Sequence, residues 1–217
     1  MNSQTNKCAL KRFFTVVVFG IAFAYIESAV VVYLRALFYK DGFTFPIADF
    51  GTIEGFKPFL LTEIGREAAT LVLILTSSML IGNNFRKRFA YFLVIFAVWN
   101  IFYYVWLKVL IGWPASIMDW DILFLIPVTW AGPVLAPVIT SLTMIVVAII
   151  LLQEHPMKIT LAKATGFLIS IIMIVIAFCI AGSRCTQPDY KSHFSWTFFL
   201  IWHVLIIILT LRCVVKK

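Results

Sequence analysis

Six long apolar stretches constrain the possible folds of this chain more than any other feature. They lie at residues 13–37, 64–81, 89–111, 134–152, 164–181 and 194–211. A helix that crosses a membrane needs about 20 mostly apolar residues, whereas a strand of a membrane barrel alternates apolar and polar residues over about 10 positions. Because these stretches are apolar throughout, we predict an all-α fold: a polytopic membrane helix bundle with six transmembrane helices, in one domain spanning residues 1–217.

The composition agrees with this fold class. Hydrophobic residues make up 62% of the chain and charged residues 13%, with a mean hydropathy of +1.00. A soluble domain is far less apolar, so the lipid bilayer is the expected surrounding. The first stretch also exceeds the apolar core of about 7 to 15 residues found in secretory signal peptides, and we expect it to stay in the mature protein as a helix.

The apolar run at 122–152 is too long for a single straight crossing. At about 1.5 Å per residue it would measure about 46 Å, against a hydrocarbon core of about 30 Å. Pro127, Pro133 and Pro137 interrupt its first half, and proline removes a backbone donor and disrupts the preceding helical turn. We therefore predict a proline-broken segment whose residues 121–130 are interfacial or re-entrant and whose true span is 134–152. A single tilted and kinked helix is the alternative.

The basic residues predict the orientation. Lys and Arg accumulate in cytoplasmic loops, and eleven of the 18 basic residues lie before the first stretch, between the second and third, between the fourth and fifth, or after the sixth. Both termini are then cytoplasmic, and the protein is predicted to be a multi-pass protein of the inner (plasma) membrane. The net charge of +8 is spread over helix ends, which indicates contact with anionic lipids and no nucleic-acid partner.

The predicted outer loop, residues 38–62, is rich in aromatic residues, with Gly and Pro between them. Aromatic side chains favour the headgroup region of a bilayer. We expect this outer aromatic loop to pack on the outer surface as a cap, and the sequence leaves open whether it also moves as a lid.

Acidic residues are distributed very unequally about this predicted membrane. Of the ten Asp and Glu residues, only Glu154 falls on the cytoplasmic side. Counting about 1.5 Å per residue from the cytoplasmic end of each helix places Glu27, Glu67 and Tyr104 in one layer of the outer leaflet, about 22 Å up, with Lys108 one turn higher. A charge inside hydrocarbon costs several kcal/mol unless it is paired or hydrated, which makes this layer a candidate site.

Other polar residues extend the candidate site. Asn100, Tyr104 and Lys108 are spaced four apart and share one helix face, and Glu63, Arg66, Arg35 and Asp121 supply further charge near the same level. The candidate ligand-binding residues are Glu27, Arg35, Glu63, Arg66, Glu67, Asn100, Tyr104, Lys108 and Asp121. A purely structural network, with Arg66 neutralising Glu63 or Glu67 and Lys108 reaching the interface, is the alternative.

Several common chemistries lack the residues that they need. A bis-histidine haem needs two histidines at matching depth, but only His203 lies in mid-membrane. There is no HExxH, no phosphate-binding glycine loop and no GxSxG. We therefore expect no metal site and no cofactor.

Four short stretches carry a resemblance. They read EIGREAAT at residues 63–70, WNIFYYVW at 99–106, GWPAS at 112–116 and WDILFLIP at 120–127. In these stretches the chain resembles a group of uncharacterised bacterial integral membrane proteins with six helices. The resemblance implies no activity, substrate or cofactor.

Three functions of different classes are compatible with these observations. The first is binding or transport of a small amphipathic or lipidic ligand in an outward-facing pocket; the absence of a clear repeat between the two halves disfavours transport. The second is an intramembrane enzyme in which a protonated Glu27 or Glu67 acts as the acid on a lipid or isoprenoid substrate. The third is a non-catalytic membrane subunit whose polar outer face docks a membrane protein partner. We favour a ligand site in the outer leaflet and make no claim of turnover.

Overall fold

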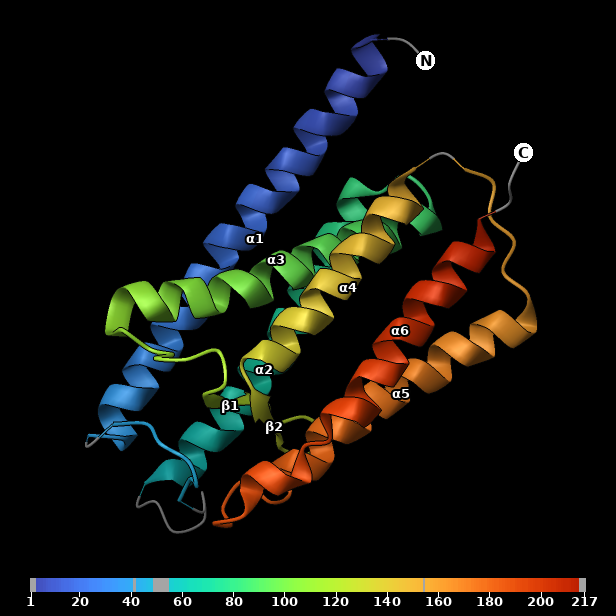
Figure 1. Cartoon of the computed structure of the whole chain (residues 1–217). Helices are drawn as coiled ribbons and strands as arrows, with labels where there is room; N and C mark the ends of the chain where they lie inside the picture. The colour runs from blue at the N-terminus through green and yellow to red at the C-terminus, as the bar shows by residue number, and fades with distance from the viewer. Residues whose placement is uncertain (1–2, 41, 49–54, 154, 215–217) are drawn as a thin grey trace.

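The computed structural model describes residues 3–40, 42–48, 55–153 and 155–214. Within them lie six long α-helices and one two-stranded sheet (Figure 1). In chain order the elements are α1 (Ser3–Phe38), α2 (Phe56–Ile81), α3 (Phe85–Ile111), β1 (Trp120–Phe124), β2 (Trp130–Pro133), α4 (Leu135–Leu152), α5 (Leu161–Gly182), the short 3₁₀ helix η1 (Tyr190–His193) and α6 (Trp196–Cys213). All six helices are long and apolar enough to cross a membrane. The predicted all-α, multi-pass membrane bundle is confirmed.

Four of the helices, α1, α2, α3 and α5, are longer than the apolar stretches that predicted them. α2 begins at Phe56 instead of residue 64, and α3 begins at Phe85 instead of residue 89. Hydropathy detects the part of a helix that suits hydrocarbon, whereas the hydrogen-bonded helix continues through its polar ends. Residues 56–62, predicted as part of the outer loop, therefore form the first turns of α2.

Helix α3 is central to the bundle, since it packs against α1, α2 and α4. Helices α5 and α6 form a separate antiparallel pair, which joins the rest mainly through β2 against α5 and through α4 against α6. The first turns of α1 and the last turn of α6 lie at the same end of the bundle (Figure 1). We call this the terminal end, and the opposite end, near the sheet, the hairpin end.

The first half of the long apolar run at 122–152 is part of a β-hairpin. β1 and β2 pair antiparallel, with Trp120 opposite Pro133 and Phe124 opposite Trp130. The helix begins only at Leu135, as predicted for a proline-broken segment, so the alternative of one kinked helix over 122–152 is wrong. Hairpin pairing satisfies backbone groups that would otherwise lie unpaired among apolar helices.

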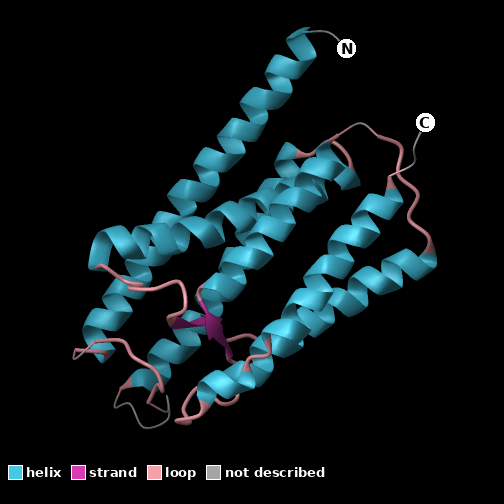
Figure 2. Cartoon of the chain, in the orientation of Figure 1, coloured by secondary structure: helices cyan, strands magenta, loops and turns pink. Residues whose placement is uncertain are grey.

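The hairpin lies among the helices (Figure 2). Phe124 packs against Phe96 and Trp99 in the middle of α3, with ring centroids 6.4 and 6.3 Å apart. On the other side Trp130 stacks on Phe178 of α5, with centroids 6.2 Å apart. The sequence prediction of a re-entrant or interfacial segment is consistent with this placement.

The described part of the predicted aromatic loop covers the hairpin end. The Phe45 ring lies 5.9 Å from Trp120 and 5.4 Å from Tyr190, centroid to centroid. The Ile47 amide donates to the Cys185 carbonyl at 3.0 Å. Residues 42–48 thus pack on β1 and on the α5–α6 connection. Residues 41 and 49–54 of this loop lie outside the described residues.

Candidate functional site

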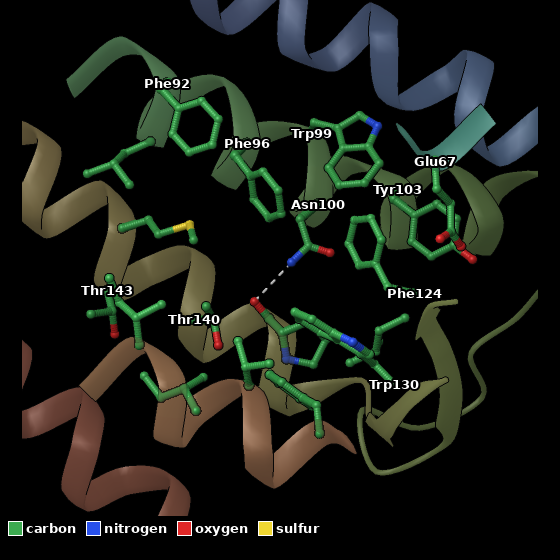
Figure 3. Close-up of a pocket in the computed structure, with 18 of the residues that line it drawn as sticks. Glu67, Phe92, Phe96, Trp99, Asn100, Tyr103, Phe124, Trp130, Thr140 and Thr143 are labelled. Carbon is green, nitrogen blue, oxygen red and sulfur yellow. Dashed lines mark hydrogen bonds between the residues drawn. The ribbon is translucent and has the colours of Figure 1, made fainter. Parts of the chain in front are cut away.

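A cavity of about 910 Å³ lies within the bundle and is lined by residues of all six long helices and of the hairpin. Figure 3 shows part of its lining. The cavity extends from Phe85 and Cys213, near the terminal end, to Arg35 and Tyr39 at the hairpin end. Most of the side chains around it are aliphatic or aromatic, and the charged ones gather at the hairpin end, except for Arg86.

An aromatic stripe on α3 forms one wall of the cavity. Phe85 and Phe89 stack in parallel, as do Phe89 and Phe92, each pair with centroids 6.4 Å apart, and Phe96 follows at 6.0 Å from Phe92. The spacing of four and three residues places these rings on one helix face. The spacing of these four phenylalanines is visible in the sequence between residues 85 and 96.

Glu27, the deepest acid of α1, pairs with Arg66 of α2. The Arg66 guanidinium also pairs with Glu63 one turn earlier, where its Nε donates to Glu63 Oε2 at 2.9 Å. Glu27 is only 9% exposed, and a buried carboxylate needs such a partner. The three residues form one ion-paired cluster on the cavity wall, as the structural alternative had allowed for Arg66 and Glu63.

Glu67 binds the backbone of the hairpin. Both of its carboxylate oxygens accept from the backbone amide of Leu125, at 3.1 and 2.9 Å. Leu125 directly follows β1, where the strand leaves the ladder. Glu67 thereby satisfies a backbone donor that the hairpin itself does not pair, inside the bundle where water is scarce.

Arg35 and Asp121 form a second ion pair, 3.0 Å long, at the hairpin end of the cavity. The guanidinium lies between two aromatic rings, with its central carbon 4.1 Å from the Phe43 centroid and 3.9 Å from that of Trp113. Stacking on rings favours Arg over Lys at such a position.

Asp121 is almost completely buried, at 2% exposed. The Tyr103 hydroxyl donates to its Oδ2 at 3.3 Å, and the Tyr104 side chain lies near the same carboxylate. Burial raises the pKa of Asp121, while the Arg35 guanidinium and the Tyr103 hydroxyl oppose that rise.

Asn100 and Lys108 make other contacts. The Asn100 side-chain nitrogen donates to the Pro137 carbonyl at 3.1 Å and to Ser141 Oγ at 3.0 Å, which joins α3 to the first turns of α4 (Figure 3). Lys108 is exposed, lies away from the cavity, and donates to the carbonyls of Gly112 and Pro114 at 3.1 and 2.8 Å. A lysine at the end of a helix stabilises the unpaired carbonyls there.

The four residues predicted to share one layer therefore do not form a single group in the structure. Glu27 and Glu67 lie on the cavity wall with different partners, Tyr104 belongs with Asp121, and Lys108 belongs to the end of α3. Depth along a helix could be counted from the sequence, but the direction of each side chain around the helix axis depends on packing.

Sequence reasoning also missed several residues of the site. Tyr103 makes the recorded hydrogen bond to Asp121, and Phe43 and Trp113 enclose Arg35. Tyr103 lay inside the stretch 99–106 that carried the resemblance, and Trp113 inside the stretch 112–116, but neither carries a charge that would have singled it out.

His203 is buried and connects α6 to α4 through its hydrogen-bond partners. Its Nδ1 lies 2.9 Å from the Phe199 carbonyl and its Nε2 lies 3.0 Å from Thr140 Oγ1, so both ring nitrogens have partners. Within the described residues, no three His, Cys, Asp or Glu side chains come together as metal ligands would.

The arrangement thus offers a long apolar cavity with polar and charged groups at one end. Such a shape suits an amphipathic molecule, whose apolar part avoids water and whose polar part needs hydrogen bonds. Comparison of the chain with models of known protein families, with curated proteins and with solved structures finds no match.

Proposed function

We propose that the protein binds a lipid-like molecule in this cavity, with its apolar chain along the aromatic wall of α3 and its polar end near Arg35 and Asp121. The observation that carries the proposal is the cavity itself. Its volume of about 910 Å³ lies within the range of about 300 to 1,000 Å³ typical of small-molecule sites.

Access from the bilayer supports a lipidic ligand. Several cavity residues are also exposed at the protein surface, for example Ile171 of α5 at 49% and Phe89 of α3 at 41%. Both lie in helices suited to cross the membrane. A molecule dissolved in the bilayer could reach these side chains without passing through water.

The contacts of the acidic residues favour binding over the other two functions. Glu27 and Glu63 are both paired with Arg66, and Glu67 is held by the Leu125 amide, whereas acid–base catalysis needs a carboxyl group aimed at the substrate. A partner-docking subunit would present a flat polar patch. Here the candidate polar residues Arg35, Glu67 and Asp121 are buried beside a cavity.

We also propose that the bundle lies in a plasma (inner) membrane, with the terminal end facing the cytoplasm. The distribution of basic residues supports this orientation. The polar end of the cavity then lies in the outer leaflet.

The test uses two neighbouring isoleucines of α5. Ile171 lines the cavity and is 49% exposed, while Ile172 is 45% exposed and does not line it. We expect Ile171→Trp to fill cavity space and reduce the amount of co-purifying lipid at least severalfold. Ile172→Trp should retain as much lipid as the wild type. The measurement is quantitative mass spectrometry of lipids extracted from protein purified in mild detergent.

Because both side chains are exposed, both variants should fold, and gel filtration checks this directly. If the two variants retain the same lipids in the same amounts as the wild type, the cavity is not where lipid is held and the proposal fails.

A further inference from the structure

The buried polar atoms that lack a partner gather around the cavity. Among the described residues these atoms are Arg35 Nη1, Tyr39 Oη and the indole nitrogens of Trp99, Trp130 and Trp202. All of these residues except Trp202 line the cavity. A buried polar group without a partner costs free energy comparable with a lost hydrogen bond, so such groups are rare and ask for an explanation.

All of these atoms can donate a hydrogen bond. An indole N–H and a guanidinium N–H can only donate, and a tyrosine hydroxyl can donate as well as accept. The Tyr39 hydroxyl carries its proton at neutral pH as tyrosines ordinarily do, and burial raises its pKa further. The atoms that remain without partners therefore call for an acceptor on the ligand.

Arg35 and Tyr39 are the donors at the polar end of the cavity. Arg35 is 9% exposed, with its two faces covered by Phe43 and Trp113 and its Nη2 bound to Asp121. Its Nη1 is buried and has no hydrogen-bond partner. Tyr39 follows one turn later and packs edge-on against the same Phe43 ring, with centroids 5.2 Å apart.

The charges at this end disfavour an anionic ligand. The ionisable side chains that line it include four carboxyl groups, from Glu27, Glu63, Glu67 and Asp121, and two guanidinium groups, from Arg35 and Arg66. A phosphate or carboxylate would face more negative than positive groups. A cation would find these acids already engaged, by Arg66, the Leu125 amide and Arg35.

We infer that Arg35 Nη1 and Tyr39 Oη bind an uncharged acceptor oxygen, a carbonyl or ester group, on the lipid held in the cavity. The inference rests on the proposed function and specifies the chemical class of its ligand. The two donors would recognise the oxygen, and the apolar wall would hold the chain.

The test compares probes that share a chain of 16 carbons and differ at one end. The probes are methyl palmitate, palmitate, hexadecylamine and hexadecane. Each competes with radiolabelled methyl palmitate for the purified full chain in detergent. We expect the ester to bind more tightly than the other three.

Tyr39→Phe removes one hydroxyl and should weaken ester binding by about three- to tenfold, as the loss of one hydrogen bond predicts. Hexadecane binding should not change. Tyr33→Phe is the matched control, because Tyr33 is 66% exposed and does not line the cavity.

Tighter binding of palmitate or of hexadecylamine by the wild type would overturn the inference, and so would equal binding of ester and hexadecane. In each of these results the cavity still holds a chain, so the proposed function stands. Failure of the wild type to bind any of the four probes would reject both.

Discussion

Most charged residues on the cavity wall have a neighbour that explains their presence inside the bundle. The clearest case is Glu67, which accepts with both oxygens from the Leu125 amide at the end of β1. Helix α2 thus supplies the acceptor for the Leu125 N–H, a backbone donor at the end of β1. Glu67 belongs to the architecture of the hairpin as much as to the cavity.

Replacing Glu67 should therefore affect stability in a way that depends on the acceptor. Glu67→Ala leaves the Leu125 N–H unpaired and should lower the free energy of unfolding by about 1 to 3 kcal/mol. Glu67→Gln keeps an acceptor oxygen and should lose less. Unfolding titrations in mixed detergent measure both variants, and equal stability of Ala and Gln variants would show that this hydrogen bond does not stabilise the protein.

At the scale of elements, the hairpin and α5 approach each other unusually closely. A Cβ atom on Gly182 would lie 1.9 Å from the Thr129 carbonyl oxygen, which is a backbone atom and cannot swing aside. Only glycine permits this distance, so Gly182 sets how tightly the α5–α6 pair packs on the sheet.

Gly182→Ala should consequently lower the free energy of unfolding by about 1 to 3 kcal/mol, the typical cost of overpacking. Gly65→Ala in α2 is the matched control, since nothing lies within 4 Å of the added methyl group. It should gain up to about 1 kcal/mol from the higher helix propensity of alanine. Thermal unfolding of the two variants measures the difference, and a Gly182→Ala protein as stable as the control would contradict the close packing.

The sequence predicted the positions of the helices far better than the contacts between side chains. The apolar stretches located the six long helices of the described residues because hydrocarbon demands apolar residues, and Pro127 and Pro133 correctly marked where the run 122–152 is not helical. The hairpin was not predicted, because its residues are as apolar as those of a helix. Lys108 was placed at a suitable depth but bonds to the end of α3, since pairing depends on helix rotation and tilt.

At the scale of the whole molecule, the predicted orientation has a direct test. Asn83 lies exposed in the turn between α2 and α3, and Figure 1 shows this turn at the terminal end. Lys191 lies exposed in η1, where the neighbouring Tyr190 packs against Trp120 of the hairpin. In a background without native cysteines, Lys191→Cys should react with a membrane-impermeant maleimide on intact cells. Asn83→Cys should react only after lysis. The reverse pattern would invert the proposed topology.

Ile171 and Phe89 line the cavity and are also exposed, on helices suited to cross a membrane. A ligand that enters the cavity past these residues would exchange with the bilayer and not with the aqueous phase. Its mole fraction among the surrounding lipids would then set the degree of saturation. The same protein would fill or empty as the membrane's composition changes, at a constant total amount of ligand per cell.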